Sequence, residues 1–474
     1  MQITIQADPA NTKTIPSLLE EMGYSLPCNC RGRHHCSGRN YPFDCSLIPK
    51  ETITITLPES ASENIMGISL EDRVPVSGTG DTILIDLGTT TVALALIDRD
   101  RAELRQTHVF ANPQRQFGSD VMSRIHASIH GKKDHLMAMI HEALAENVRL
   151  LCQKNHQSPD EITYCYIAGN TAMIHLLMGY DCTPLSRSPF IPVKTPPSPF
   201  LYKGCKIQIL PWFSAFVGGD IAAGMYACHM DTAASGRDSD TVLLIDLGTN
   251  GEMLLRHKDQ FYSAATAAGP AFEGNGLSCG CPGIPGAISA VRLMSLRPKL
   301  TTIGHRLPLG ICGSGAVSLC AELLRHRYIT TDGILTEKFP PEGILLGHSP
   351  AHTPLFFTAD DLRQIQLSIA AIAAGIDTLA YEAGITPADI SAVYLGGGFG
   401  FYLDLTACQT LGLFSSLPVS CIKPMGNTCL RGLFRYACDS DVPSLILLPD
   451  THTVSLAEHP CFRQQFISHM TYSG

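Results

Sequence analysis

Two stretches of the sequence place an acid, a glycine and hydroxyl side chains in the same order. Leu-Ile-Asp-Leu-Gly-Thr occurs at residues 84–89 and again at residues 244–249, each time between two apolar runs. This pattern predicts a buried β-hairpin with a tight polar turn. The glycine lets the backbone approach a ligand, the turn amides and hydroxyls suit phosphate oxygens, and the aspartate suits a water-bridged Mg²⁺. The candidate residues are Asp86, Gly88, Thr89, Thr90 and Thr91 in the first copy and Asp246, Gly248, Thr249 and Asn250 in the second.

A glycine-rich turn follows a short apolar strand at residues 393–400, Val-Tyr-Leu-Gly-Gly-Gly-Phe-Gly. One Asp-Leu-Gly-Thr copy alone fits an ordinary hairpin turn equally well. The repeat and the late glycine turn together predict two half-domains that close on one nucleotide. This order resembles the actin, sugar kinase and heat-shock-protein ATPase superfamily. The resemblance implies an α/β fold of duplicated ribonuclease H-like ATPase halves, with Gly396, Gly397 and Gly398 as the adenosine loop.

The composition is that of a mildly acidic globular protein. The chain has 474 residues, a net charge of −9 and a hydrophobic fraction of 45%. This length allows about two to four domains, and nothing in the charge suggests a nucleic-acid footprint. The apolar runs are too short for a transmembrane helix, and the first residues lack the pattern of a signal peptide. We therefore expect a cytoplasmic protein with neither nucleic-acid nor membrane partners, and a homodimer is compatible with the sequence.

Four of the eighteen cysteines crowd into residues 28–45. Because disulfides rarely persist in the cytoplasm, this cluster points to a metal or an iron-sulfur centre. Residues 1–60 read as strand, helix, cysteine loop and strand, which resembles a shortened plant-type ferredoxin domain with a 2Fe-2S cluster. Arg39 stands where that pattern expects a third ligand, so a structural zinc and a module without metal stay open as alternatives. The four cysteines are Cys28, Cys30, Cys36 and Cys45.

These features divide the chain into four parts. Residues 1–60 form the small α+β cysteine-rich module, and the polar, glycine-rich residues 61–80 read as a linker. We predict the first ATPase half at residues 81–235 and the second at residues 236–474.

Residues 269–286 are too rich in glycine for a regular element. A long irregular loop inside a compact domain usually has a function. We interpret the loop as a rim over the nucleotide cleft or as a partner-docking loop, with Glu273 and Ser278 as its reactive polar groups.

Several other residues are candidates for the same cleft. Glu252 follows the second turn and suits a role in positioning the attacking water or the metal, with a strand-pairing carboxylate as the equal alternative. Gly313 and Ser314 open a predicted helix, which resembles the connecting segment that enters the nucleotide site in the superfamily. Gly-Asn-Thr at residues 169–171 and 426–428 and Gly-Gly-Asp at 218–220 also precede predicted helices. The first of these turns faces a ligand or is a plain structural turn.

Eight ordered motifs give a closer resemblance. Preceded by a cysteine-rich module, they resemble the reductive activators of corrinoid proteins over nearly the whole chain from about residue 81. The resemblance implies an ATP-hydrolysing enzyme that pushes an electron from an iron-sulfur centre onto the Co(II) corrinoid protein of a methyltransferase system, restoring Co(I). The motifs are NPQRQFGSDVMSRI, AGNTAMIHLLMG, FVGGDIAAG, GTNGEM, AAGPAFEG, LGICGSGAV, YLGGGFG and MGNTCLRG.

The resemblance also implies roles for residues. The two turns and the late glycines bind Mg-ATP, the four clustered cysteines hold the electron-donating centre, and the loop at residues 269–286 faces the corrinoid protein. Asp86, Asp246 and Glu252 are the candidate catalytic carboxylates. Three departures are the cysteine spacing, the absence of a middle domain that some activators place between the ferredoxin module and the ATPase, and Ile369, where relatives tend to have a lysine.

Two rival functions fit the same fold. A metabolite kinase would use the two turns without needing a cysteine module. A nucleotide-gated binding protein would dock a partner through the glycine-rich loop without redox chemistry, and fold alone does not separate these functions.

Overall fold

The structure is a computed structural model that describes residues 2–5, 53–56, 81–118, 120–193, 199–202, 204–231, 241–294, 297–397, 403–414, 417–438 and 448–472. Near the start of the chain, β1 (Gln2–Ile5) and β2 (Ile53–Thr56) pair antiparallel. These two strands were predicted to flank the cysteine stretch. Cys28, Cys30, Cys36, Cys45 and the linker at residues 61–80 lie outside the described residues.

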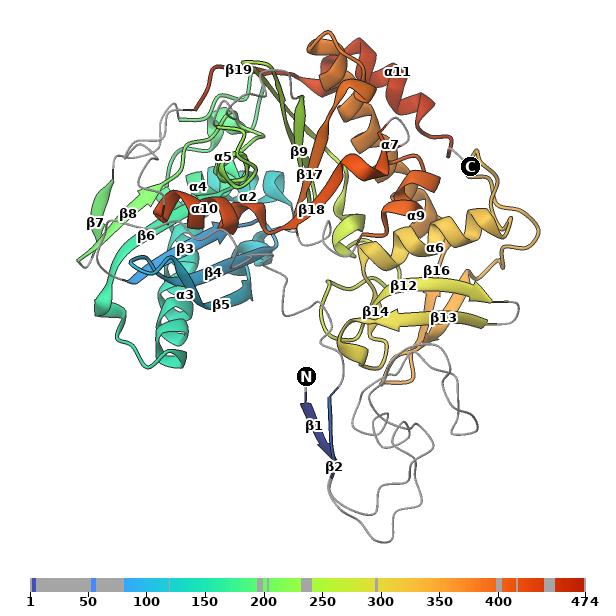
Figure 1. Ribbon diagram of the computed structural model, residues 1–474, viewed down its shortest axis with the longest axis horizontal. Helices are drawn as coiled ribbons and strands as arrows, with labels where there is room; N and C mark the ends of the chain where they lie inside the picture. The colour runs from blue at the N-terminus through green and yellow to red at the C-terminus, as the bar shows by residue number, and fades with distance from the viewer. Residues whose placement is uncertain are drawn as a thin grey trace.

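The first half is built on a six-stranded sheet in the order β5-β4-β3-β6-β8-β7. β3 and β4 form the antiparallel hairpin that the sequence predicts, and β6 and β8 run parallel to β3. The central strands read as continuous apolar runs because helices cover both faces of the sheet (Figure 1). The strands are β3 (Asp81–Leu87), β4 (Thr91–Asp98), β5 (Glu103–Ala111), β6 (Ile162–Gly169), β7 (Phe200–Tyr202) and β8 (Cys205–Ile209), and the helices are α2 (Val121–Ala127), α3 (Lys133–Lys154), α4 (Thr171–Met178) and α5 (Gly219–Ala227).

The second half repeats this plan with the sheet order β18-β17-β9-β10-β11-β19. The predicted hairpin β9–β10 is again antiparallel, and β17 and β18 are parallel to β9 in the same sheet. The strands are β9 (Val242–Leu247), β10 (Gly251–His257), β11 (Gln260–Thr266), β17 (Ala392–Gly396), β18 (Ile422–Gly426) and β19 (Thr451–Thr453), and the helices are α6 (Gly313–Arg325), α7 (Ala359–Glu382), α9 (Leu405–Thr410), α10 (Thr428–Cys438) and α11 (Pro460–Ser468).

Two small sheets are inserted between β11 and α7. They lie on the lower right of Figure 1, below α6, and they extend the second half away from the first. The three-stranded sheet consists of β12 (Ala287–Met294), β13 (Arg297–Thr302) and β14 (Gly310–Ile311), and the two-stranded sheet of β15 (Ile344–His348) and β16 (Pro354–Phe357).

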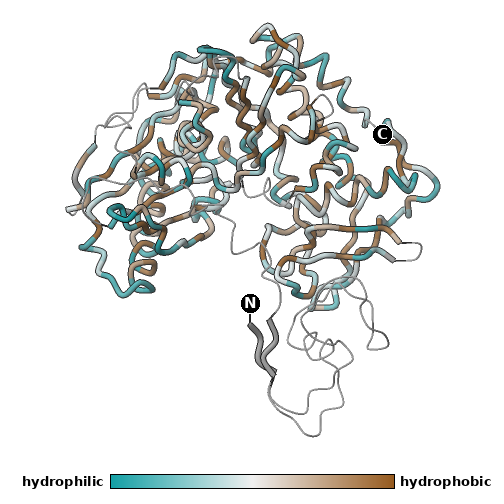
Figure 2. Tube along the Cα trace, in the orientation of Figure 1, coloured by the Kyte–Doolittle hydropathy of each residue, from teal (hydrophilic) through white to brown (hydrophobic). Residues whose placement is uncertain are grey.

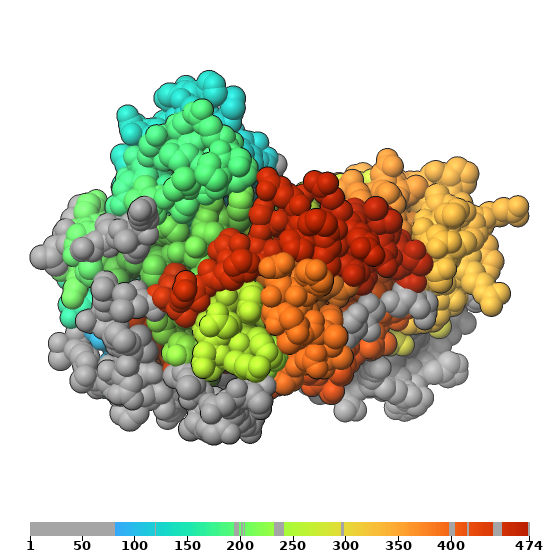
Figure 3. Space-filling view, turned by 90° about the horizontal axis from the view of Figure 1, so that it is seen from above, coloured from blue at the N-terminus to red at the C-terminus, as the bar shows by residue number. Residues whose placement is uncertain are grey.

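The two halves share a layer of helices. α10, near the end of the chain, packs on α5 and contacts β3, β4 and β6 of the first sheet. Leu84, Ile221, Leu244 and Leu433 belong to one buried cluster that spans both sheets and both helices. Apolar segments fill the interior strands of both halves in Figure 2. In Figure 3 the C-terminal segment, in red, lies across the middle between the green first half and the yellow and orange second half.

Among the described residues, no helix combines the length and the apolar character that crossing a bilayer requires.

Candidate functional site

A cavity of about 530 Å³ lies between the two predicted hairpins. Both turns, the start of α6 and the glycine-rich loop contribute to its wall. The sequence-predicted residues that line it are Asp86, Gly88, Thr89, Thr90, Thr91, Asp246, Gly248, Thr249, Asn250, Glu252, Glu273, Gly313, Ser314 and Gly397. The structure therefore brings most of the predicted residues to one place, whereas Ser278 and Gly396 are not among the lining residues.

Each of the two turns is held by a hydrogen bond from a different source. In the second turn, the Gly248 amide donates to the Asn250 carbonyl at 3.0 Å. In the first turn, the support comes from Asn112, whose Nδ2 donates to the Gly88 carbonyl at 2.9 Å. Asn112 also caps the 3-10 helix Pro113–Phe117 by accepting from the Gln114 amide. The first turn is thus fixed from outside the hairpin.

Glu273 joins the two turns. The Thr90 hydroxyl donates to Glu273 Oε2 at 2.8 Å, and the Thr249 amide donates to Glu273 Oε1 at 3.0 Å. A carboxylate that accepts one hydrogen bond from each turn demonstrates that an oxyanion fits between them. Glu273 was predicted to face a partner. The structure places it inside the cavity, at the end of the 3-10 helix Pro270–Glu273.

Ser278, the other candidate on the loop, is exposed but hydrogen-bonded. Its amide donates to Asp361 Oδ1 at 2.7 Å, and its hydroxyl donates to the same oxygen at 3.1 Å. Asp361 belongs to the capping box that starts α7. Ser278 therefore fastens the loop to α7. Its predicted role toward a partner stays a prediction.

The rest of the loop forms part of the cavity wall. Pro282, Gly283 and Ile284 line the cavity, and the Ile284 side chain is 45% exposed. This position fits the interpretation of the loop as a rim over the cleft, while docking of a partner stays a prediction. Gly313 and Ser314 begin α6 beside the loop, so the amide end of a thirteen-residue helix opens on the cavity.

Four carboxylates meet at the floor of the cavity: Asp86, Asp220, Asp246 and Glu252. Burial raises the pKa of Asp86, although hydrogen bonds from Asn427 and Cys429 oppose this rise. Burial and the Asp220 charge raise the pKa of Asp246 to about 8, and burial and the Asp86 charge raise that of Asp220 to about 7. Burial also holds the pKa of Glu252 well above its ordinary value. Like charges this close do not all ionise at neutral pH unless a cation joins them.

These oxygens suit Mg²⁺, which proteins usually bind through one or two carboxylates, waters and substrate phosphates. Within the described part of the chain, no three histidine, cysteine or acidic side chains form a ready-made metal site. Asp220 was not predicted as a site residue, although it was expected to open a helix. It lies in the first turn of α5. The Gly-Gly-Asp sequence at the start of this helix is the sequence feature that could have identified it.

Two asparagines reach across the cavity. Asn170 Nδ2 donates to Glu252 Oε1 at 3.0 Å, and Asn427 Nδ2 donates to Asp86 Oδ2 at 2.7 Å. Both come from the repeated Gly-Asn-Thr motif. The first copy was left open between a ligand-facing turn and a structural turn, and the structure shows that both copies cap helices and line the cavity.

The late glycines lie against the second aspartate. Gly396 is the register partner of Asp246, and Gly397 follows with φ +85° at the cavity wall. A Cβ atom on Gly397 would lie 2.8 Å from Asp246 Oδ1, so the position has no room for a side chain. Gly398 lies outside the described residues, and binding of adenosine by these glycines stays a prediction.

Comparison with protein families gives two matches. A family model described as the C-terminal domain of RACo, the ASKHA domain, matches residues 240–474. A second model, described as the RACo middle region, matches residues 82–233. The segment predicted as the first ATPase half is thus the one that matches the RACo middle region.

Two characterised proteins and one solved structure are similar along most of the chain. The corrinoid activation enzyme RamQ of Eubacterium limosum is 30% identical over 432 residues, which cover 84% of this chain and 71% of that protein. The Co(II) methylated amine-specific corrinoid protein reductase of Methanosarcina barkeri is 26% identical over 390 residues, 73% of this chain and 68% of that one. A structure described as the reductive activator for corrinoid, iron-sulfur protein superposes with a TM-score of 0.72 at 25% identity, covering 100% of this chain and 78% of that chain.

Proposed function

Because the chain belongs to the family of reductive activators of corrinoid proteins, we propose that it uses Mg-ATP to return a corrinoid protein from Co(II) to Co(I). The observation that carries the nucleotide part is the pair of turns around one cavity, with donors from both turns already on a single carboxylate. A metabolite kinase would need the same cavity, but it would not belong to this family.

In this proposal, ATP phosphates take the donors that Glu273 now holds. Thr90 and Thr249 supply one hydrogen bond from each half, and the start of α6 adds amides from the second half. Mg²⁺ supplies the positive charge that the polyphosphate and the acidic floor both need. Asp86 and Asp246 are the carboxylates proposed to hold it, through water, and Glu252 is the candidate for positioning the attacking water.

Reduction of a Co(II) corrinoid is strongly uphill for an ordinary electron donor, so the nucleotide must drive the reaction. Two halves that meet on one nucleotide form a bistable element, which ATP biases toward the closed state. A docked partner is then remodelled only by as much as its affinities for the two states differ. We place ATP binding and hydrolysis in this role, and the corrinoid protein as the partner that responds.

We also propose that the electron comes from an iron-sulfur centre held by Cys28, Cys30, Cys36 and Cys45, which crowd into one short stretch of the sequence. Iron, sulfide and zinc contents of protein purified without oxygen test this assignment. Stoichiometric iron and sulfide with a reducible charge-transfer band are expected, and Cys36→Ser should remove most of the iron. Zinc, or no metal, would contradict the electron-donor role and leave an ATPase that remodels its partner.

The whole function is tested by following the Co(I) absorbance of a Co(II) corrinoid protein under anaerobic conditions. With a reductant, Mg-ATP and this protein, Co(I) should accumulate. It should not accumulate when ATP is omitted or replaced by a non-hydrolysable analogue. Equal Co(I) formation with and without ATP would contradict the proposal.

A further inference from the structure

Asn170 and Asn427 make reciprocal contacts between the halves. Asn170 belongs to the first half and donates to Glu252 of the second, whereas Asn427 belongs to the second half and donates to Asp86 of the first. Their two acceptors lie on β10 and β3, the strands that carry the two turns. Each asparagine therefore ties its own half to the opposite hairpin.

The same side chains are fixed by their own helices. Asn170 Oδ1 accepts from the Ala172 amide at the start of α4, and Asn427 Oδ1 accepts from the Leu430 amide at the start of α10. An asparagine amide has one oxygen and one NH₂ group. In both residues the oxygen caps the helix, which leaves the NH₂ group aimed at the other half.

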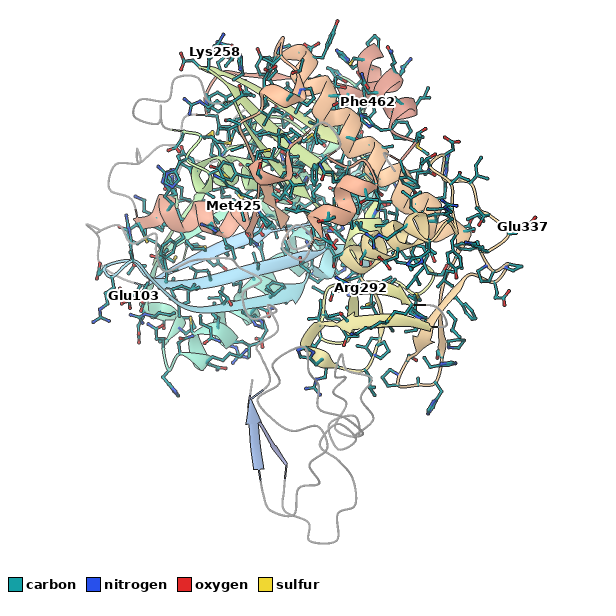
Figure 4. The ribbon with its side chains drawn as sticks, turned by 45° about the vertical axis from the view of Figure 1, so that its right-hand side comes forward. Glu103, Lys258, Arg292, Glu337, Met425 and Phe462 are labelled. Carbon is teal, nitrogen blue, oxygen red and sulfur yellow. The ribbon has the colours of Figure 1, made fainter. Side chains whose placement is uncertain are left out.

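The reciprocity is not a by-product of the duplicated fold. Asn170 follows β6, which is hydrogen-bonded directly to β3, whereas Asn427 follows β18, which is separated from β9 by β17. The two asparagines thus occupy different places in their sheets and still make the same kind of contact. Figure 4 shows Met425 at the end of β18, in the centre of the molecule where α10 crosses toward the first-half strands.

We propose that Asn170 and Asn427 are positioning residues that couple closure of the two halves to the placement of Glu252 and Asp86 around Mg-ATP. The inference rests on the proposed use of ATP in this cavity. Both hydrogen bonds cross from one half to the other, so a change in how the halves meet at the cavity acts on both acceptors. Losing either bond leaves a buried carboxyl group without its asparagine partner, which costs more than losing an exposed hydrogen bond.

The alternative is that the asparagines only cap their helices. Serine and aspartate separate the two roles, because both are as good as asparagine at capping. Serine is too short to donate across the cavity. Aspartate keeps the cap but turns a second carboxylate toward Glu252 or Asp86. Asp404→Ser, at the cap of α9 and away from the cavity, is the matched control for a changed cap.

The experiment measures the KM for Mg-ATP, kcat and thermal stability in the full chain. Asn170→Ser and Asn427→Ser should each raise KM about tenfold, the loss expected for one hydrogen bond to a carboxylate. The matching aspartate variants should raise KM further, while the two serine variants keep a melting temperature near that of the control. Serine variants with wild-type KM and kcat would overturn the inference.

A double-mutant cycle tests the cross-cavity coupling directly. In a Glu252→Ala background, Asn170→Ser should have little further effect on KM, because its acceptor is already gone. Full additivity of the two changes would also overturn the inference. Wild-type protein that hydrolyses Mg-ATP while the serine variants behave normally would sink only this inference. Wild-type protein with no Mg-ATP hydrolysis would sink the proposed function as well.

Discussion

The two Asp-Leu-Gly-Thr hairpins share a sequence but differ in what surrounds their aspartates. Asp86 accepts a hydrogen bond from Asn427, and its register partner on β4 is Ala93. Asp246 faces Glu252 on β10 and has Asp220, Asp86 and Glu273 as charged neighbours. Neutral donors thus partly offset the charge of the first aspartate, whereas burial and the acids around the second raise its pKa to about 8. Duplication of the fold has kept a hydrogen-bond donor in each turn and has given the two aspartates different electrostatic surroundings.

The largest expected effect is the loss of Mg-ATP affinity on replacing Asp246, which should exceed the loss on replacing Asp86. Asp246→Asn should weaken Mg-ATP binding by about 100-fold, since this proposed Mg²⁺ carboxylate has no neutral donor beside it among the described residues, and Asp86→Asn by about tenfold. Asp246→Asn should also stabilise the nucleotide-free protein at pH 8.5 by roughly 1–3 kcal/mol, because a carboxylate with a raised pKa opposes folding once it ionises. Titration calorimetry and thermal unfolding measure both. Equal losses of affinity in the two variants would break the comparison.

A second contrast concerns the turn glycines. A Cβ atom on Gly88 would lie 2.5 Å from the Thr91 carbonyl oxygen, which belongs to the backbone. The nearest atom to a Cβ on Gly248 is Glu273 Oε1 at 3.3 Å, the end of a side chain that can move. Gly88→Ala should therefore cost about 2 kcal/mol of unfolding free energy, and Gly248→Ala less than about 1 kcal/mol. Chemical denaturation of both variants checks this order, and a larger loss in Gly248→Ala would contradict it.

The carboxyl groups of Asp220 and Asp246 should make Mg-ATP affinity and protein stability depend on pH. The pKa values of Asp220 and Asp246 are raised to about 7 and about 8, so protons compete with Mg²⁺ below these values. Mg-ATP affinity should rise about tenfold from pH 6 to pH 8.5. Stability of the nucleotide-free protein should fall over the same range, because a carboxyl with a raised folded-state pKa stabilises the fold only while it is protonated. Asp246→Asn should flatten both curves more than Asp86→Asn does.

The smallest expected effect is that of Glu252→Gln on binding. Burial holds the pKa of Glu252 well above its ordinary value, so its protonated form persists to a higher pH than that of an exposed glutamate. Glutamine resembles the protonated glutamate, and its side-chain oxygen can still accept the hydrogen bond from Asn170 Nδ2. Mg-ATP affinity should therefore change less than about threefold. If Glu252 positions the attacking water, kcat should fall by about 100-fold or more, as for a general base. An unchanged kcat would exclude it from that role.

The local parts of this arrangement are readable from the sequence. The apolar runs around Asp86 and Asp246 predict both hairpins, and the Gly-Asn-Thr motifs predict two helix starts, which the structure confirms at α4 and α10. These features depend on residues within one turn or one strand of each other. Short-range rules therefore suffice for them.

Contacts between segments that are far apart in the sequence cannot be predicted from such local patterns. Glu273 approaches Thr90, which is 183 residues away, and Asn427 approaches Asp86 over 341 residues. A pattern of residue types contains no record of which acid will reach which turn. Ile369 shows the reverse error, in which the sequence suggests a site residue that the structure places in the core. It was singled out because relatives tend to carry a lysine there, yet it is 1% exposed among the core residues of the second half.

The shared layer of α5 and α10 bears on how the chain folds during synthesis. The cluster that contains Leu84 and Ile221 also contains Leu433 and Cys438, so the apolar face of the first sheet is covered partly by α5 and partly by α10, which is made much later. Until α10 is made, part of that face stays open to solvent and to other chains. Pairings at such long range also slow folding, because loop-closure entropy is lost before the contacts form. A ribosome-bound first half should therefore depend on chaperones, and the emergence of α10 should complete the shared layer of both halves.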